Sequence, residues 1–576
     1  MDRTETETQT SSALPAHPFD PVRAIGTAYR VDSTHVRMRL FGAPGEESAA
    51  RGTHVVAPGQ VGDFVVFDCG DVAVFGRLTS VELPEDGGAK THDAGPSASA
   101  LLLTSMSLAT GEVTPGVLTY PRLGSTVYAA HPLLLKWIAE ESVRDGGDGH
   151  PLILDLATLP DGTHIGLTPE RLFGRHCALV GTTGGGKSYT LARIIEACSA
   201  YSAKLVLLDP TGEYHRLDSR VRHISVGGPD RPATAVEAIF PYRELVEEDM
   251  IALFEPDSAV QLARMRSAIK SLKLANVLGL GHQLVSGNGC IPKAHQLKAA
   301  FDEEFKRHID VVDSHAASFD LELLPNQIRL ECVWPSAGSA QTPGERARWG
   351  GPHEGDLNAC DALIARIEAH INAPEYHTIF QTSGSYDTVP REILEFLESD
   401  DTVLRISLRQ LSYTASIREI VANAIGRHLL ELGKSGAFAG KPVVVLVDEA
   451  HQFVSKELGD ETWRYSLDAF ELIAKEGRKY SVTVCLATQR PRDIPEGVMS
   501  QVGTFVVHRL ISDADRAVVE RASGEIDRAA ADFLPTLAPG QAVVIGVDFP
   551  MPLMIQIRKP TREPDAEGPD YQTHWR

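Results

Sequence analysis

The sequence lacks the features that mark disulfide-rich, zinc-binding and membrane-spanning proteins. Its 576 residues include only seven cysteines, which are scattered and form no Cys-x-x-Cys pair, so neither a disulfide framework nor a structural zinc site is indicated. No apolar run is long enough to cross a bilayer. Residues 1–20 lack the basic and then apolar pattern of a signal peptide. These absences predict a protein of the reducing cytoplasm.

Basic residues are also in deficit. The chain has 55 Lys and Arg against 77 Asp and Glu, a net charge of −22, which argues against a partner as anionic as DNA. The argument is limited, because salt confines phosphate contacts to roughly 8 to 10 Å. Loops that line a central pore could therefore bind DNA while the exterior stays acidic.

The length exceeds what one hydrophobic core usually holds, so two or three domains are expected. Short alternating runs, as in residues 61–83, predict a small β-barrel. From residue 151 strands alternate with helices, which is typical of a parallel α/β sheet. The predicted parts are a flexible segment at 1–24, the barrel at 25–125, an α/β core at 151–241 and 399–558, a helical insertion at 242–398 and a tail at 559–576. A linker is predicted at 145–150, and loops at 84–99 and 333–357.

Short apolar runs in the α/β core read as buried parallel strands. The predicted strands are His176–Val180, Lys204–Asp209, Thr402–Leu408, Val443–Asp448, Thr483–Thr488 and Thr504–Arg509.

The first of these strands leads into a phosphate-binding motif. Residues 181–188 read GTTGGGKS, and the strand before them and the helix after them give the required context. Glycines let backbone N–H groups surround phosphates, the lysine reaches the outer phosphates, and the hydroxyl binds magnesium. The motif predicts ATP and Mg²⁺ as cofactors, and a chance glycine-rich turn is the alternative. The predicted nucleotide-binding residues are Gly181, Thr183, Gly184, Gly185, Gly186, Lys187 and Ser188.

A second strand ends in two acids, Asp448 and Glu449. Asp448 is predicted to hold Mg²⁺ together with Ser188, and Glu449 to polarise the attacking water as a general base. Alone, such a pair could be a solvated strand end. Its place after a phosphate loop in the same chain favours the catalytic role.

A third strand ends in Gln489, which is predicted to sense the γ-phosphate, although strand-end glutamines often serve only as turn residues. Just before this strand, residues 461–476 predict a helix ended by Gly477. The apolar stripe of that helix is Trp463, Leu467, Phe470 and Ile473.

Arg478 follows this helix and could point out of its own subunit toward a neighbour's nucleotide. We predict that it is an arginine finger. The alternative is a solvated basic cluster with Lys475 and Lys479.

Together these residues resemble the HerA branch of the FtsK/HerA family of hexameric DNA translocases. The resemblance rests on HCALVGTTGGGKS, LLDPTGEY, VVLVDEAHQF, EGRKYSVTVCLATQRP and LAPGQAVVIG, in that order, and on PRLGSTVY at the exit of the barrel. It implies an α/β fold with a RecA-like P-loop ATPase core, an N-terminal β-barrel like that of HerA and ATP synthase, and an inserted helical bundle. It also implies that Asp209 and Glu213 join the nucleotide site, that Arg478 acts across subunits and that the assembly is a homohexamer. Gly185 stands where serine is common in the family, and residues 333–357 have no identified counterpart.

By this resemblance the chain is expected to be an ATPase that moves double-stranded DNA and works with a separate nuclease or sirtuin-like effector. Anti-phage defence is the favoured role. DNA end resection by HerA-type motors is best known from archaea, and the composition of this chain shows no thermophilic bias. DNA end resection with a NurA-type nuclease is one alternative. A ring scaffold that uses ATP mainly for assembly is another, and a small-molecule kinase is the weakest.

Overall fold

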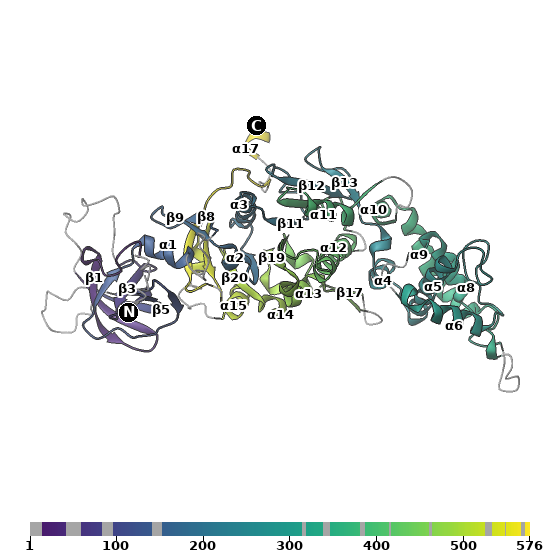
Figure 1. The fold of residues 1–576 in the computed structure, drawn as a ribbon, viewed down its shortest axis with the longest axis horizontal. Coiled ribbons are helices and arrows are strands. Elements are labelled where there is room, and N and C mark those ends of the chain that lie inside the picture. The colour runs from purple at the N-terminus through teal and green to yellow at the C-terminus, as the bar shows by residue number, and fades with distance from the viewer. Residues whose placement is uncertain are drawn as a thin grey trace, which may run out of the picture. The chain divides into compact units, whose positions relative to one another are not determined.

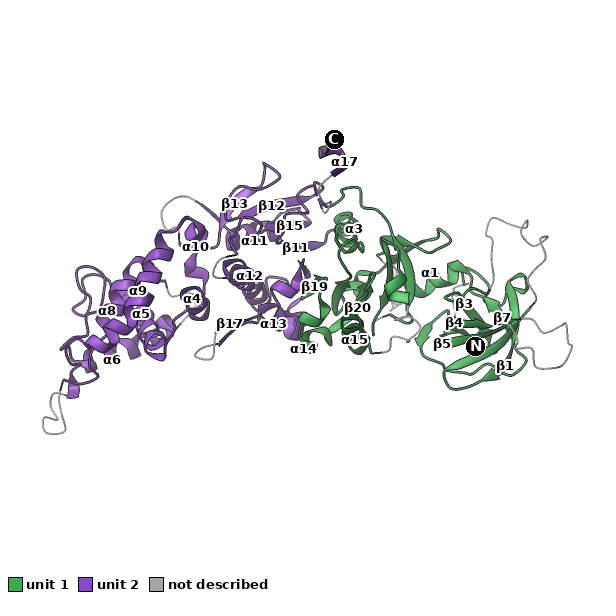
Figure 2. Ribbon diagram, turned by 180° about the vertical axis from the view of Figure 1, so that it is seen from behind, with its two compact units in different colours: residues 1–201, 483–563 green, residues 202–482, 564–576 purple. Residues whose placement is uncertain are grey.

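The structure is a computed structural model in two compact units, residues 1–201 with 483–563 and residues 202–482 with 564–576 (Figure 2). It describes residues 14–41, 59–82, 96–140, 152–313, 318–337, 346–380, 386–413, 416–454, 456–459, 464–524, 533–547, 549–565 and 571–575. The predicted linker at 145–150 lies outside these ranges, as do most of the predicted segments 1–24 and 84–99 and part of 333–357 and 559–576. No helix within the described ranges is both long enough and apolar enough to cross a membrane.

A closed β-barrel occupies the N-terminal part of the first unit (Figure 1). The strands follow the order β2-β1-β7-β3-β4-β5, and pairing of β2 with β5 closes the barrel, while β6 adds to β5 outside the ring. Their bounds are β1 Ala24–Val31, β2 His35–Leu40, β3 Phe64–Asp68, β4 Val72–Glu82, β5 Ser97–Ser107, β6 Val113–Pro115 and β7 Thr126–Ala129.

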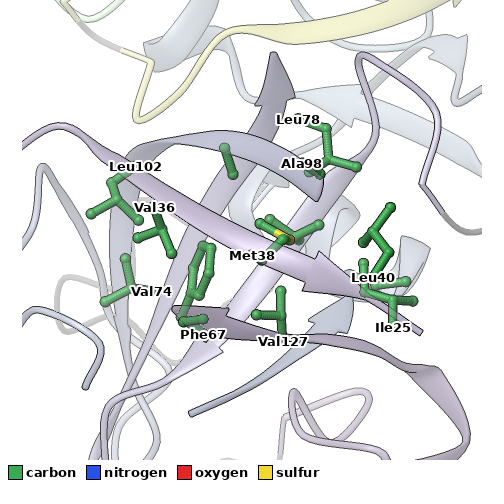
Figure 3. Packing of buried hydrophobic residues seen from close by; sticks show 14 residues of the cluster. Ile25, Val36, Met38, Leu40, Phe67, Val74, Leu78, Ala98, Leu102 and Val127 are labelled. Carbon is green, nitrogen blue, oxygen red and sulfur yellow. The ribbon is translucent and has the colours of Figure 1, made fainter. Parts of the chain in front are cut away.

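The barrel closes around an apolar interior because its strands alternate between inward and outward side chains. In β2 the buried residues are Val36, Met38 and Leu40, and the residues between them are exposed. Figure 3 shows Met38 and Phe67 among the side chains that fill this core.

The first unit also holds a mixed sheet with the order β19-β10-β20-β21-β22-β8-β9. β10 (His176–Val180) lies between β19 (Val482–Thr488) and β20 (Val502–Val507) and is parallel to both. The others are antiparallel to their neighbours: β21 Gln541–Ile545, β22 Leu553–Ile557, β8 Leu154–Thr158 and β9 His164–Leu167. The helices of this unit are α1 Pro132–Glu140, α2 Pro169–Phe173, α3 Lys187–Ser199, α14 Glu496–Met499 and α15 Asp513–Ala522.

The second unit holds six parallel strands in the order β14-β13-β12-β15-β11-β16. Their bounds are β11 Lys204–Asp209, β12 Val221–Val226, β13 Val236–Ile239, β14 Asp387–Thr388, β15 Val403–Ser407 and β16 Val443–Val447. The second unit also contains the helices α11 (Val389–Glu398), α12 (Ile417–Lys434) and α13 (Ala469–Glu476) (Figure 1). The predicted α/β fold class, with its N-terminal barrel and inserted helices, is confirmed.

The inserted helices pack mainly on one another. Helices α5 (Ala259–Leu278), α8 (Leu324–Glu331) and α9 (Glu354–Asn372) form the centre of the bundle (Figure 1). The shorter helices are α4 Glu247–Phe254, α6 Lys298–Arg307, α7 Ile309–Val312 and α10 His377–Phe380. The end of the predicted insertion behaves differently, because β14 joins the sheet and α11 packs against β12 and β13.

The helix predicted from residue 461 was wrong in its first half. Helix α13 begins only at Ala469, and β18 (Arg464–Leu467) pairs instead with β17 (Lys456–Gly459) in an antiparallel hairpin. The hydroxyl of Tyr465 donates a 2.8 Å hydrogen bond to the buried carboxylate of Asp249, a tertiary contact that favours the strand. Of the predicted stripe, Leu467, Phe470 and Ile473 are buried, and Trp463 lies outside the described residues.

Candidate nucleotide-binding site

In the first unit, the predicted phosphate loop connects β10 to the amino end of α3. Gly184 and Gly186 have φ values of 73° and 115°, which residues other than glycine rarely adopt. A Cβ atom on Gly186 would lie only 3.1 Å from the backbone of Gly540. Lys187 is the first residue of α3 and is 5% exposed. The backbone N–H groups of a glycine-rich loop and a lysine at a helix amino terminus are suited to bind a phosphate group.

Gln489 lies beside this loop. β10 and β19 are parallel with Val180 opposite Thr488, and the amide of Gly181 donates a 3.3 Å hydrogen bond to the carbonyl of Thr488. The hydroxyl of Thr183 donates a short hydrogen bond to Oε1 of Gln489. The structure therefore brings the predicted sensor into contact with the predicted phosphate loop.

The buried side chain of His508, which no local sequence pattern indicates, packs behind the phosphate loop and bonds to the first turn of α3. Nδ1 of His508 lies 2.9 Å from the carbonyl of Gln541, so Nδ1 carries the proton and donates, and Nε2 is left to accept from the hydroxyl of Thr190 at 2.7 Å. Burial, with a smaller contribution from nearby Lys187, lowers the pKa of His508 to about 4. His508 is therefore neutral near pH 7 and adds no charge beneath the phosphate loop.

The second unit holds the acidic pair at the end of β16. Asp448 is 1% exposed, and its Oδ1 accepts a 2.9 Å hydrogen bond from the amide of Glu449. Glu449 has φ 46° and ψ 44°, a left-handed conformation that costs a non-glycine residue about 1 kcal/mol or more. Its Oε2 lies 3.4 Å from Nδ1 of His451. Two neighbouring carboxylates therefore lie at the carboxyl end of β16, the first buried and the second in a left-handed turn.

Asp209 and Glu213 lie in the same unit, at the end of the neighbouring strand β11. The backbone amide of Asp448 donates to the carbonyl of Leu208 at 3.3 Å, so the ends of β11 and β16 coincide. The hydroxyl of Tyr214 donates a 3.1 Å hydrogen bond to Oδ2 of Asp448. Asp209, Glu213, Asp448 and Glu449 therefore share one edge of the sheet.

Arg478 lies at the opposite edge. It is exposed and belongs to a short 3-10 helix, Gly477–Tyr480, that continues α13. The carbonyl of Ser481 accepts a hydrogen bond from Val443, the first residue of β16. Because β16 has five residues, Arg478 is separated from Asp448 by roughly 16 Å of strand. An arginine in this place lies far from the acidic pair predicted for the nucleotide site of its own chain.

Gly477 ends α13 as predicted: the helix stops at Glu476 and Gly477 is its C-cap. Its φ is −55°, so it does not adopt the left-handed conformation that glycine often has at this position. Glycine is needed because a Cβ atom there would lie 2.6 Å from the carbonyl oxygen of Val482. Ser481, with φ 58°, ends the short 3-10 helix that follows.

Two family models match the chain: the central domain of the helicase HerA, over residues 155–321, and a helicase HerA-like C-terminal domain, over residues 412–554. Among curated proteins, it is 24% identical over 404 residues to a probable helicase of Methanocaldococcus jannaschii, covering 69% of this chain and 68% of the relative. It is 23% identical over 443 residues to the DNA double-strand break repair helicase HerA of Pyrococcus furiosus, covering 76% and 73%.

Several solved structures are also similar to the chain. VirB4 of Thermoanaerobacter pseudethanolicus matches with a TM-score of 0.43 and 14% identity, covering 75% of this chain and all of that one. The plasmid coupling protein TrwB in complex with ADP and Mg²⁺ matches with a TM-score of 0.41 and 16% identity, covering 72% and 90%.

Proposed function

Because the chain belongs to the HerA-type ATPases of the FtsK/HerA clade, we propose that it is an ATP-driven motor that moves double-stranded DNA. The observation that carries the proposal is the loop of residues 181–186, whose left-handed glycines place backbone amides and the buried Lys187 at the amino end of α3. The curated relatives named as HerA are described as DNA double-strand break repair helicases.

The nucleotide is proposed to be ATP with Mg²⁺. Gly181, Thr183, Gly184, Gly185 and Gly186 surround the phosphates through their backbones, and Lys187 neutralises the outer phosphate charge. Ser188 and Asp448 would hold Mg²⁺, which would supply charge stabilisation at the transferred phosphoryl group. Glu449 takes the proton of the attacking water, and Gln489 orients the γ-phosphate. The buried carboxylate of Asp448 and its neighbour at the end of β16 suit these two roles.

Arg478 is proposed to act on the nucleotide of an adjacent protomer in a homohexamer. Its place at the amino end of β16, away from Asp448, supports action across subunits rather than within one. An arginine supplied by the neighbouring protomer would make ATP hydrolysis depend on assembly of the ring. Hydrolysis in one subunit would then be coupled to the position of the next.

The motor is proposed to serve a separate nuclease or sirtuin-like effector in anti-phage defence. DNA break repair with a NurA-type nuclease is the second candidate, which the names of the HerA relatives favour. Phage plaque counts on a host with and without the intact motor would separate the two roles. Protection that Lys187→Ala abolishes supports defence, and unchanged plaque counts together with sensitivity to DNA breaks support repair.

The test of the motor itself is hydrolysis of ATP with and without double-stranded DNA. We expect stimulation by DNA in the wild type, and loss of at least 100-fold in Lys187→Ala and in Glu449→Ala. Glu449→Gln should still bind ATP, so an effector that remains active with this variant would indicate a ring scaffold. Intact hydrolysis in both alanine variants would refute the site.

A further inference from the structure

The resemblance to the family implies that Asp209 contacts the nucleotide, but its surroundings in the second unit indicate a different role for this residue. Asp209 and Arg405 are both fully buried and form an ion pair, with Nε of Arg405 donating to Oδ2 of Asp209 at 2.7 Å. Arg405 comes from β15, the strand beside β11.

The carboxylate of Asp209 has no acceptor capacity left for a ligand. Its Oδ1 accepts from the amides of Gly212 at 2.8 Å and Glu213 at 3.2 Å. Its Oδ2 accepts from the amide of Tyr214 at 3.1 Å and from Arg405. A carboxylate offers about four lone-pair sites, and these four donors use them all. A magnesium ion or a phosphate-bound water would have to displace one of these hydrogen bonds.

Arg405 is itself fixed from its far side. Its guanidinium donates to the carbonyl of Arg231 at 2.8 Å and lies 3.3 Å from the carboxylate of Asp230. The hydroxyl of Ser407 donates to the same carboxylate at 2.5 Å. Paired charges at this depth hold their geometry tightly, because moving either one leaves the other unpaired in the interior.

The chain held by Asp209 is residues 210–214, which carry Glu213. Gly212 in this turn has φ 81°, and a Cβ atom there would lie 2.7 Å from Cδ of Arg409, so the turn needs glycine at this position. The same turn carries Tyr214, whose hydroxyl reaches Asp448. The position of the turn therefore sets both an acidic side chain and a partner of the predicted metal ligand.

We propose that Asp209 and Arg405 are positioning residues: they hold the turn at 210–214 so that Glu213 is presented to the reaction, and Asp209 binds neither the nucleotide nor its metal. This inference rests on the proposed ATPase function. It predicts that loss of Asp209 slows turnover without weakening the binding of ATP and Mg²⁺.

The test compares Asp209→Asn, Glu213→Gln and the double variant in the full-length protein, with Asp302→Asn on the exposed face of α6 as the control. Asparagine keeps the shape of the side chain but offers one carbonyl oxygen in place of two carboxylate oxygens. We expect kcat to fall about 10- to 100-fold in Asp209→Asn, because small misplacement of a reacting group has this cost. The affinity for a fluorescent ATP analogue and its Mg²⁺ dependence should stay within about threefold of the wild type.

The double variant should be no slower than Glu213→Gln alone, since one residue acts through the other. Arg405→Lys, which keeps the charge but loses the planar fork, should give the same pattern as Asp209→Asn. A large loss of nucleotide or Mg²⁺ affinity in Asp209→Asn would overturn the inference. Multiplying effects in the double variant would overturn it too, as would normal turnover in Glu213→Gln.

Failure of the wider function has a different signature. If Glu449→Gln hydrolyses ATP at the wild-type rate, the measured activity does not come from this site, and the proposed function falls whatever Asp209→Asn does. The binding measurement judges Asp209 independently of turnover.

Discussion

The hydroxyl of Tyr214 donates a 3.1 Å hydrogen bond to Asp448, and this contact joins the ends of two neighbouring parallel strands. Both side chains are buried, at 1% exposure each. A buried carboxylate that carries a metal must keep a fixed orientation, and a phenol hydroxyl provides that orientation without adding charge.

Tyr214→Phe should therefore weaken the use of Mg²⁺ rather than the folding of the chain. We expect the Mg²⁺ concentration that half-saturates hydrolysis to rise about 3- to 10-fold, equivalent to roughly 1 kcal/mol for one lost hydrogen bond. Hydrolysis measured across a Mg²⁺ titration tests this. Tyr413→Phe, at an exposed tyrosine, is the control and should not change the titration.

Arg478→Ala should abolish hydrolysis, and mixing should restore part of it. A finger that acts across subunits contributes at least 100-fold to kcat. In a mixture with Lys187→Ala, some interfaces combine the intact loop of one variant with the intact arginine of the other. Activity that appears only in the mixture supports action in trans, whereas two variants that stay inactive together contradict it. Lys479→Ala, the exposed neighbour, should behave as wild type.

Gly186→Ala should weaken ATP binding by about 5- to 150-fold, since a non-glycine residue at this φ costs on the order of 1–3 kcal/mol and the new methyl group would crowd Gly540. Titration with a fluorescent ATP analogue measures the change. Gly281→Ala is the matched control, because nothing lies within 4 Å of a Cβ atom there. Equal affinities in the two variants would show that the loop does not hold the nucleotide.

His508 should make the stability of the folded chain depend on pH. Its pKa falls from 6.5 to about 4 on folding, mainly through burial. The unfolded chain therefore binds a proton that the native protein does not, so the contribution is complete above pH 6.5 and is lost as the pH falls toward 4. It amounts to about 3 kcal/mol.

Denaturant unfolding between pH 7.5 and 4.5 measures this contribution, with His508→Gln as the comparison. The difference in unfolding free energy between wild type and variant should shrink as the pH falls, because glutamine does not titrate. A difference that is constant with pH would mean that His508 is not the group responsible.

The sequence by itself determined the strands and the positions of the predicted site motifs along the chain, because these depend on local patterns. His176–Val180 and Lys204–Asp209 are strands with the predicted bounds, since apolar runs of this short length favour strands over helices. The predicted phosphate loop could also be located from the sequence, because its glycines and lysine lie within eight consecutive residues.

Only the tertiary structure decided which side chains support these motifs. His508 lies 318 residues from Thr190, Arg405 lies 196 residues from Asp209, and Tyr214 lies 234 residues from Asp448. It also made residues 464–467 a strand although their spacing fitted a helix, because Tyr465 reaches Asp249 and the backbone pairs with β17. Hydrogen bonds between distant segments have no period along the chain, so they can be known only once the strands have been placed side by side.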